Sequence, residues 1–159
     1  GGPPKRGSGA ISHLVKAYQA NRDNHSGSAR DDVMSLWIRA EVLRLTNMRA
    51  AQLAKAGNPG PEGSVGQAVM AILNQDIWET TVGLQGMAGQ LDYDYTFRRP
   101  ESTDLTGSNA GYAFLRARAN TIEGGTTEVL KNILGEQVLG LPGEPRVDKD
   151  IPWVDVPRG

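Results

Sequence analysis

The 159-residue sequence contains no cysteine and only two histidines, His13 and His25. The absence of cysteine excludes a disulfide framework, thiolate catalysis and cysteine-ligated zinc or iron–sulfur sites. His13 lies in a helical pattern and His25 in a loop, and neither has a carboxylate or a serine at a spacing typical of a hydrolase triad. We therefore expect no metal site and no hydrolase chemistry.

The sequence also has little excess charge and no long apolar run. Its 17 Lys and Arg residues nearly balance 18 Asp and Glu residues, which gives a net charge of -1, and the basic residues are spread along the chain. This distribution is not that of a nucleic-acid-binding surface. No segment has the length or apolarity of a signal peptide or a membrane span. We expect a soluble, cytoplasmic protein that binds neither nucleic acid nor membrane.

Apolar residues recur at helical spacing along much of the chain, and no segment shows the alternation typical of a strand. The helical segments are 11–21, 28–54, 64–82, 110–119 and 126–139. Capping boxes are expected at two of the starts, Ser28 with Asp31 and Ser64 with Gln67. The pattern predicts an all-α fold, an antiparallel four-helix bundle followed by an extended C-terminal tail.

Segments rich in glycine and proline surround this helical region. Residues 1–10, GGPPKRGSGA, are typical of a linker or loop that continues from a missing upstream part. Residues 11–140 then form the predicted bundle, interrupted after Gln90 by a connection too long for a simple turn. Residues 141–159 contain four prolines and are predicted to be an extended tail.

The strongest local signal is the stretch from Glu123 to Glu128, which reads EGGTTE. Gly124 and Gly125 allow positive φ or a close approach to a ligand, and Thr126 is a good N-cap. The first N–H groups of the helix would face outward and suit a phosphate or carboxylate. A carboxylate at Glu128 competes with such an anion, since it satisfies the same helix dipole. An ordinary capped corner and an anion site both remain open.

A second glycine cluster reads GLQGMAGQ over residues 83–90. Its glycines are spaced by three at the end of a helix, with no strand before them, so they do not form a dinucleotide-binding fingerprint. From its residues alone, this cluster is interpreted as a closely packed helix terminus.

These motifs resemble a known family. Residues 112–145, YAFLRARANTIEGGTTEVLKNILGEQVLGLPGEP, closely resemble the C-terminal end of acyl-CoA dehydrogenases, most of all the bacterial branch. Residues 40–67 resemble the long central helix of that family with its turn and next helix, and LQGMAG resembles its Gln-x-x-Gly-Gly corner. The resemblance implies the C-terminal helical bundle of a larger enzyme, whose N-terminal helical domain and middle β-domain are not matched by this chain.

The resemblance also implies a reaction and its participants. Members of the family remove the α-proton of an acyl-CoA thioester with a glutamate and pass the β-hydrogen as hydride to FAD, leaving a trans-2-enoyl-CoA. The implied partners are the acyl-CoA substrate, an electron-transfer acceptor and further subunits, as a homodimer, a homotetramer or a hetero-oligomer. The long faces of the second and third helices and the tail are the expected assembly surfaces. The chain alone is expected to be inactive.

Residue by residue, the resemblance assigns a catalytic candidate, Glu123. Alignment on the shared Gly-Thr places Gly124 at the position of the family's catalytic glutamate, so Glu123 falls one residue early. Other members carry the glutamate on the first helix of the bundle, shortly before a segment similar to GGPP, which would place the base upstream of Gly1. That second arrangement is the one we favour.

The resemblance further implies a set of FAD contacts. They are Gln85, Gly89, Gly124, Gly125, Thr126 and Glu128. Two departures from the family pattern weaken this set: Ala88 replaces a glycine, and an Arg-x-x-Phe-Gly run is not recognisable near residues 21–32. The alternative function is a structural or partner subunit that keeps the bundle but not the chemistry.

Overall fold

The computed structural model describes residues 4–58, 60, 62–91, 109–143 and 151–156. Five α-helices occupy these ranges: α1 (Ala10–Ala20), α2 (Ala29–Lys55), α3 (Glu62–Leu84), α4 (Ala110–Ala117) and α5 (Thr127–Gln137). Short 3-10 turns lie at η1 (Arg22–Asn24), η2 (Gly86–Gln90), η3 (Arg118–Thr121) and η4 (Trp153–Asp155). The described ranges contain no strand, which confirms the all-α prediction. No helix in the same ranges is long and apolar enough to cross a membrane.

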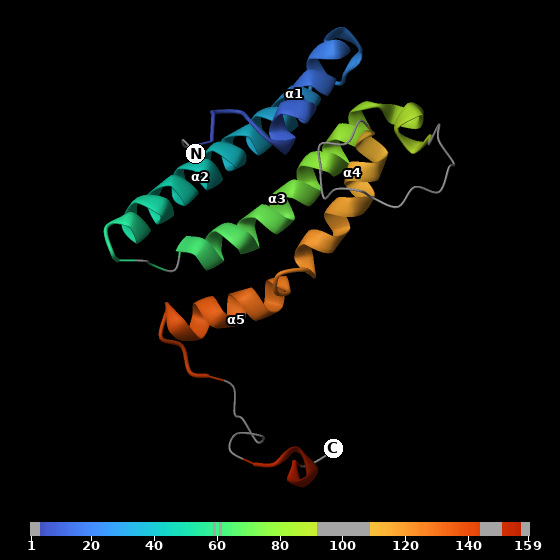
Figure 1. Ribbon diagram of the computed structural model, residues 1–159. Coiled ribbons are helices and arrows are strands. Elements are labelled where there is room, and N and C mark those ends of the chain that lie inside the picture. The colour runs from blue at the N-terminus through green and yellow to red at the C-terminus, as the bar shows by residue number, and fades with distance from the viewer. Residues whose placement is uncertain (1–3, 59, 61, 92–108, 144–150, 157–159) are drawn as a thin grey trace.

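Helix α3 lies at the centre of the arrangement and packs against α1, α2, α4 and α5 (Figure 1). Successive helices from α1 to α4 run in opposite directions, as the bundle prediction requires. Helix α2 is 27 residues long, which corresponds to about 40 Å. Helix α5 turns away from α4 and crosses beneath the first half of α3 (Figure 1).

Two apolar clusters hold these helices together. In the first, Leu14 of α1 is fully buried among side chains of α1, α2 and α3, namely Ile11, Val33, Leu36, Leu73 and Ile77. In the second, Trp78 of α3 packs against Ala113 and Ala117 of α4. Because alanine is small, these two positions allow α4 to approach α3 closely, and the indole ring is buried between the two helices.

The helix starts agree with the sequence prediction only in part. Thr126 caps α5 through its side chain, as expected. Ser28 does not cap α2 through its side chain, because its backbone is helical rather than extended, and its hydroxyl lies 3.1 Å from that of Ser26 instead. The predicted Ser28–Asp31 capping box is therefore wrong. The α3 box is also wrong, since this helix begins at Glu62 and places Ser64 inside its first turn.

Some predictions fall outside the described residues. The long connection after Gln90 lies almost entirely in 92–108, and the tail is described only at 141–143 and 151–156. Within the latter range, η4 forms one 3-10 turn, so the tail is not extended throughout. The boundaries at residues 10 and 140 stay predictions.

Candidate functional site

The corner between η3 and α5 adopts the conformation that its glycines permit. Gly124 and Gly125 both have positive φ, +70° and +104°, and Thr126 returns to an extended conformation. The Thr126 hydroxyl accepts a hydrogen bond from the Val129 N–H at 3.3 Å. Because neither glycine carries a side chain, the backbone of residues 123–126 is open to a ligand.

This corner has more hydrogen-bond donors than the chain satisfies. Within the described residues, the N–H groups of Thr127 and Glu128 have no acceptor. The hydroxyl of Thr127 is buried and has no partner in the same part of the chain, although buried hydroxyls are usually hydrogen-bonded. Unsatisfied donors at a helix N-terminus suit a polar or anionic group. Sequence reasoning missed Thr127, because nothing in TTE distinguishes the second threonine from the first.

Another residue that the sequence did not assign to this site lies beside it. A Cβ atom added to Gly124 would stand 3.4 Å from Nε2 of Gln67, so the amide of this α3 residue borders the corner. The sequence placed Gln67 in a capping box, and its position near Gly124 follows only from the packing of α3 against the end of η3.

The carboxylate of Glu123 is held on both oxygens. Arg116 donates to it through Nη1 at 2.9 Å and Nη2 at 2.8 Å, and Asn120 donates to Oε1 at 2.9 Å. The hydrogen bond from Arg116 is the main cause that lowers the pKa of Glu123 below its usual value, against a smaller opposing effect of desolvation. A general base that works near neutral pH needs a raised pKa, so this environment acts against a catalytic role for Glu123.

The lowered pKa of Glu123 predicts a pH-dependent contribution to stability. A carboxylate whose folded-state pKa is depressed stabilises the fold above its unfolded-state pKa, about 4.3, and loses this effect as the pH falls through the folded-state value. Glu123→Gln should therefore lower the free energy of unfolding at pH 7 but make little difference near pH 3. Urea unfolding over this pH range measures the effect, with Asp23→Asn, at an exposed position of η1, as the control. A deficit that stays constant from pH 7 to pH 3 would contradict the prediction.

The second predicted corner lies at the far end of α3. Gln85 is exposed, whereas Gly89 is buried in η2, where an added Cβ would stand 2.6 Å from the carbonyl oxygen of Val82. Gln67, beside the first corner, and Leu84, at the end of the helix, are 17 positions apart, which corresponds to about 25 Å. Within one chain, Gln85 and Gly89 therefore lie far from residues 123–128.

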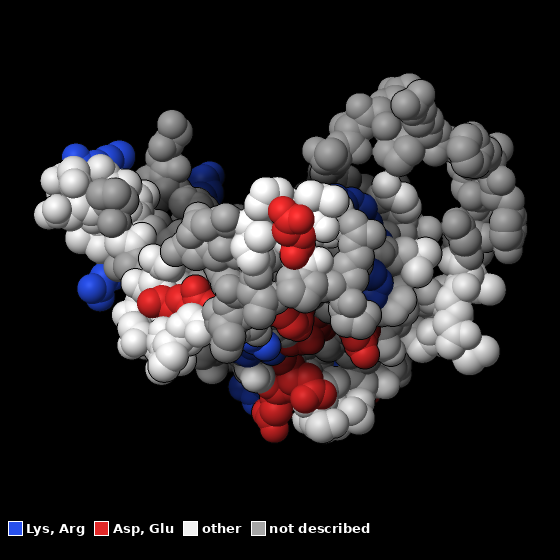
Figure 2. Space-filling model, turned by 90° about the horizontal axis from the view of Figure 1, so that it is seen from below, with Lys and Arg blue, Asp and Glu red and all other residues white. Residues whose placement is uncertain are grey.

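Charge is mixed on the face of the molecule that is seen from below the view of Figure 1. Figure 2 shows Asp and Glu side chains gathered near the middle of this face, with Lys and Arg around them. An anion that binds here would depend on individual N–H groups and arginines, because the visible face offers no broad basic surface among the described residues.

Comparison with known proteins gives consistent matches. A family model described as acyl-CoA dehydrogenase, C-terminal domain, matches residues 13–139. The acyl-CoA dehydrogenase IpdE1 of Mycolicibacterium smegmatis is 27% identical over 138 residues, which cover 84% of this chain and 30% of that protein. The acyl-CoA dehydrogenase FadE34 of Mycobacterium tuberculosis is 29% identical over 114 residues, which cover 71% of this chain and 14% of that protein.

Solved structures show the same fold. The Tcur3481-Tcur3483 steroid ACAD matches with a TM-score of 0.67 and 22% identity, over 84% of this chain and 34% of that one. A variant of the same steroid ACAD matches with a TM-score of 0.65 and 24% identity over the same shares. The chain thus spans about a third, or less, of the length of the relatives that it matches.

Proposed function

The chain belongs to the acyl-CoA dehydrogenase family, as its C-terminal domain, and we propose that it serves an FAD-dependent dehydrogenase that converts an acyl-CoA thioester to a trans-2-enoyl-CoA. The observation that carries this proposal is the corner of Gly124, Gly125 and Thr126, which combines open backbone with unsatisfied donors. The larger protein would act in the cytoplasm on an acyl-CoA and pass electrons to a separate acceptor.

The residues at the corner fit a flavin chemically. The N–H groups of Thr127 and Glu128 would donate to oxygen atoms of the cofactor, and the two glycines would leave room for it. Gln85 and Gly89 are proposed to contact the FAD of a neighbouring subunit, in keeping with their distance from this corner. FAD, when bound, supplies the acceptor for the hydride that leaves the substrate.

We place the catalytic base outside this chain, on the part that precedes Gly1. Glu123 is a poor candidate, because Arg116 and Asn120 occupy its carboxylate and lower its pKa. Gly124 stands where the family's glutamate aligns and has no side chain to offer. An upstream glutamate would leave the η3–α5 corner free to bind the cofactor.

The outer face of α2 is the proposed assembly surface. Four large apolar side chains follow one another along it at helical spacing and are about half exposed: Met34, Ile38, Val42 and Leu45. Exposed apolar stripes of this length mark protein contacts. A second subunit, identical or different, would cover this stripe in a dimer or tetramer.

The second candidate function is a partner subunit that keeps the bundle without the chemistry. The engaged carboxylate of Glu123 and the glycine at position 124 favour it, since neither supplies a base. An absorbance spectrum of the full-length protein distinguishes the two functions. An oxidised flavin band that bleaches on anaerobic addition of an acyl-CoA supports the dehydrogenase. A colourless protein that FAD cannot reconstitute supports the partner subunit.

Thr126→Val in the full-length protein should lower FAD retention. Valine cannot accept the hydrogen bond from the Val129 N–H, and loss of an N-cap destabilises a helix start by about 1 kcal/mol. The first turn of α5 would then fray where the flavin is proposed to bind. FAD retained after gel filtration measures the effect, and Thr126→Ser, which keeps the hydroxyl, is the control. Equal retention in both variants would exclude this role for Thr126.

A further inference from the structure

We propose that Asn120, held by Asn74, is a positioning residue that orients the η3–α5 corner for FAD; this inference rests on the proposed function. The two asparagines are 46 positions apart in the sequence, and neither belongs to the corner itself. Their side chains form a continuous set of hydrogen bonds from α3 to the residue that precedes Gly124.

The hydrogen bonds follow one another without a gap. Asn74 donates from Nδ2 to Oδ1 of Asn120 at 2.7 Å, and Asn120 donates from Nδ2 to Oε1 of Glu123 at 2.9 Å. Asn120 is 4% exposed, so its amide has little contact with water and depends on these partners. Arg116 of α4 closes the set with its two bonds to the same carboxylate.

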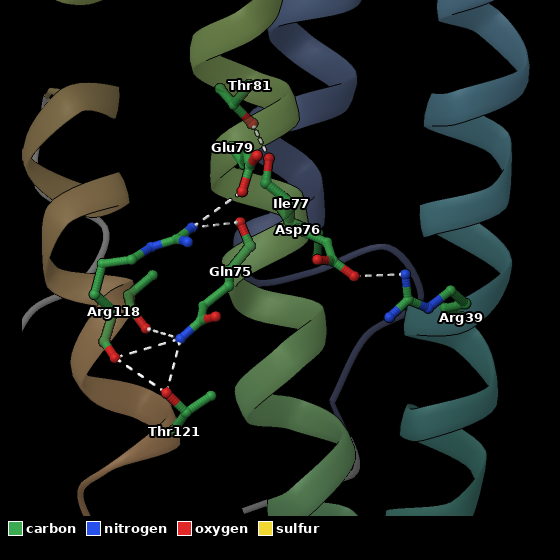
Figure 3. A network of polar contacts seen from close by, with 9 residues as sticks. Arg39, Gln75, Asp76, Ile77, Glu79, Thr81, Arg118 and Thr121 are labelled. Carbon is green, nitrogen blue, oxygen red and sulfur yellow. Dashed lines mark hydrogen bonds and ion pairs between the residues drawn. The ribbon is translucent and has the colours of Figure 1, made fainter. Parts of the chain in front are cut away.

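The neighbouring residue of α3 holds the backbone just before the corner. Gln75 donates from Nε2 to the carbonyl oxygens of Ala117 and Arg118 at 3.2 and 3.3 Å, and to the hydroxyl of Thr121 at 3.1 Å (Figure 3). Arg118 donates in turn to the carbonyl oxygen of Gln75 at 3.4 Å. These bonds attach η3 to α3.

The corner needs such support because its own backbone is permissive. Gly124 and Gly125 can adopt many conformations, so they do not determine the direction in which α5 leaves η3. Glu123 is the last side chain before them, and its carboxylate is fixed by Asn120 and Arg116. Buried Leu130 and the packing of α5 against α3 hold the corner on the α5 side, and the contact that begins at Asn74 holds it on the η3 side. The glycine backbone between these two supports therefore depends on both, and ligand affinity is sensitive to small displacements of such groups.

Two substitutions in the full-length protein break the same contact from opposite sides. Asn120→Asp keeps the oxygen that accepts from Asn74 but loses the donor to Glu123 and places a like charge beside it. Glu123→Ala removes the exposed end of the contact and leaves the buried asparagines in place. The matched control is Asp76→Asn, which weakens the 2.7 Å pair with Arg39 on the side of α3 that faces α2 (Figure 3).

The measurement is the dissociation constant of FAD, obtained by titrating the apoprotein and following flavin fluorescence, together with the urea midpoint of each variant. We expect Asn120→Asp and Glu123→Ala to weaken FAD binding at least about tenfold. The control should stay within about twofold of the wild type. We also expect the visible circular dichroism of the FAD-saturated variants to change, which a loss of stability alone would not cause.

Three results would overturn the inference. If Glu123→Ala binds FAD with wild-type affinity, the inference is overturned, even if Asn120→Asp fails to fold. The inference is also overturned if Asp76→Asn loses as much FAD affinity as the two variants do and these losses follow the urea midpoints. That result would show a general effect on stability. A wild-type protein that does not bind FAD overturns the proposed function as well, whereas normal binding by the wild type and both variants overturns the positioning role only.

Discussion

Gly89→Ala is expected to lower the free energy of unfolding by about 1–3 kcal/mol. The added Cβ would lie 2.6 Å from the carbonyl oxygen of Val82, 3.0 Å from Cγ1 of the same residue and 3.2 Å from Cβ of Gln85. The nearest of these atoms belongs to the backbone of α3 and cannot rotate away as the end of a long side chain can. The η2 turn must therefore move away from the helix, and the proposed FAD contacts of Gln85 and Gly89 would move with it.

The same substitution six positions earlier provides the control for Gly89→Ala. Gly83 lies within α3, and no atom stands within 4 Å of an added Cβ there. Gly83→Ala should raise stability by about 0.5–1 kcal/mol, because alanine loses less backbone entropy in a helix than glycine does. Urea unfolding followed by circular dichroism compares the two variants. Changes of the same sign in both would show that the contact with Val82 does not determine the choice of glycine at position 89.

Leu14→Ala is expected to have the largest effect of any single substitution proposed here, a loss of about 2–5 kcal/mol in the free energy of unfolding. Leu14 is 0% exposed and lies in the apolar cluster shared by α1, α2 and α3. Removing its side chain deletes contacts with all three helices and leaves a cavity. Helix α1 is only 11 residues long and depends on this packing, because isolated helices of that length are marginal in water.

The control for Leu14→Ala is Leu115→Ala in α4. Leu115 is 68% exposed, so the same truncation there should change stability by less than about 0.5 kcal/mol. Thermal unfolding of the two variants at equal protein concentration provides the comparison. A loss in Leu14→Ala no greater than in Leu115→Ala would mean that α1 does not contribute to the core as the structure places it.

The sequence alone determined the fold class and the position of each helix. Apolar residues at a spacing of three and four identified all five α-helices, because burying one face of a helix requires that period. The sequence also predicted positive φ at Gly124 and Gly125 and the N-cap at Thr126, because these conformations depend on local backbone energetics. The resemblance to acyl-CoA dehydrogenases was confirmed by the family match. The Ser28 and Ser64 boxes failed because capping depends on how the preceding chain enters the helix.

Only the tertiary structure decided which polar groups meet at the corner. Asn74 and Asn120 carry no local signal, and they pair because α3 and η3 pack at one particular register. The same packing brings Gln67 beside Gly124 and separates Gly89 from that corner by most of the length of α3. Periodicity in a sequence specifies which face of a helix is buried, but it does not specify the rotation and shift of one helix against another. Those two quantities result from the fit of all side chains in the core at once, and they determine the site.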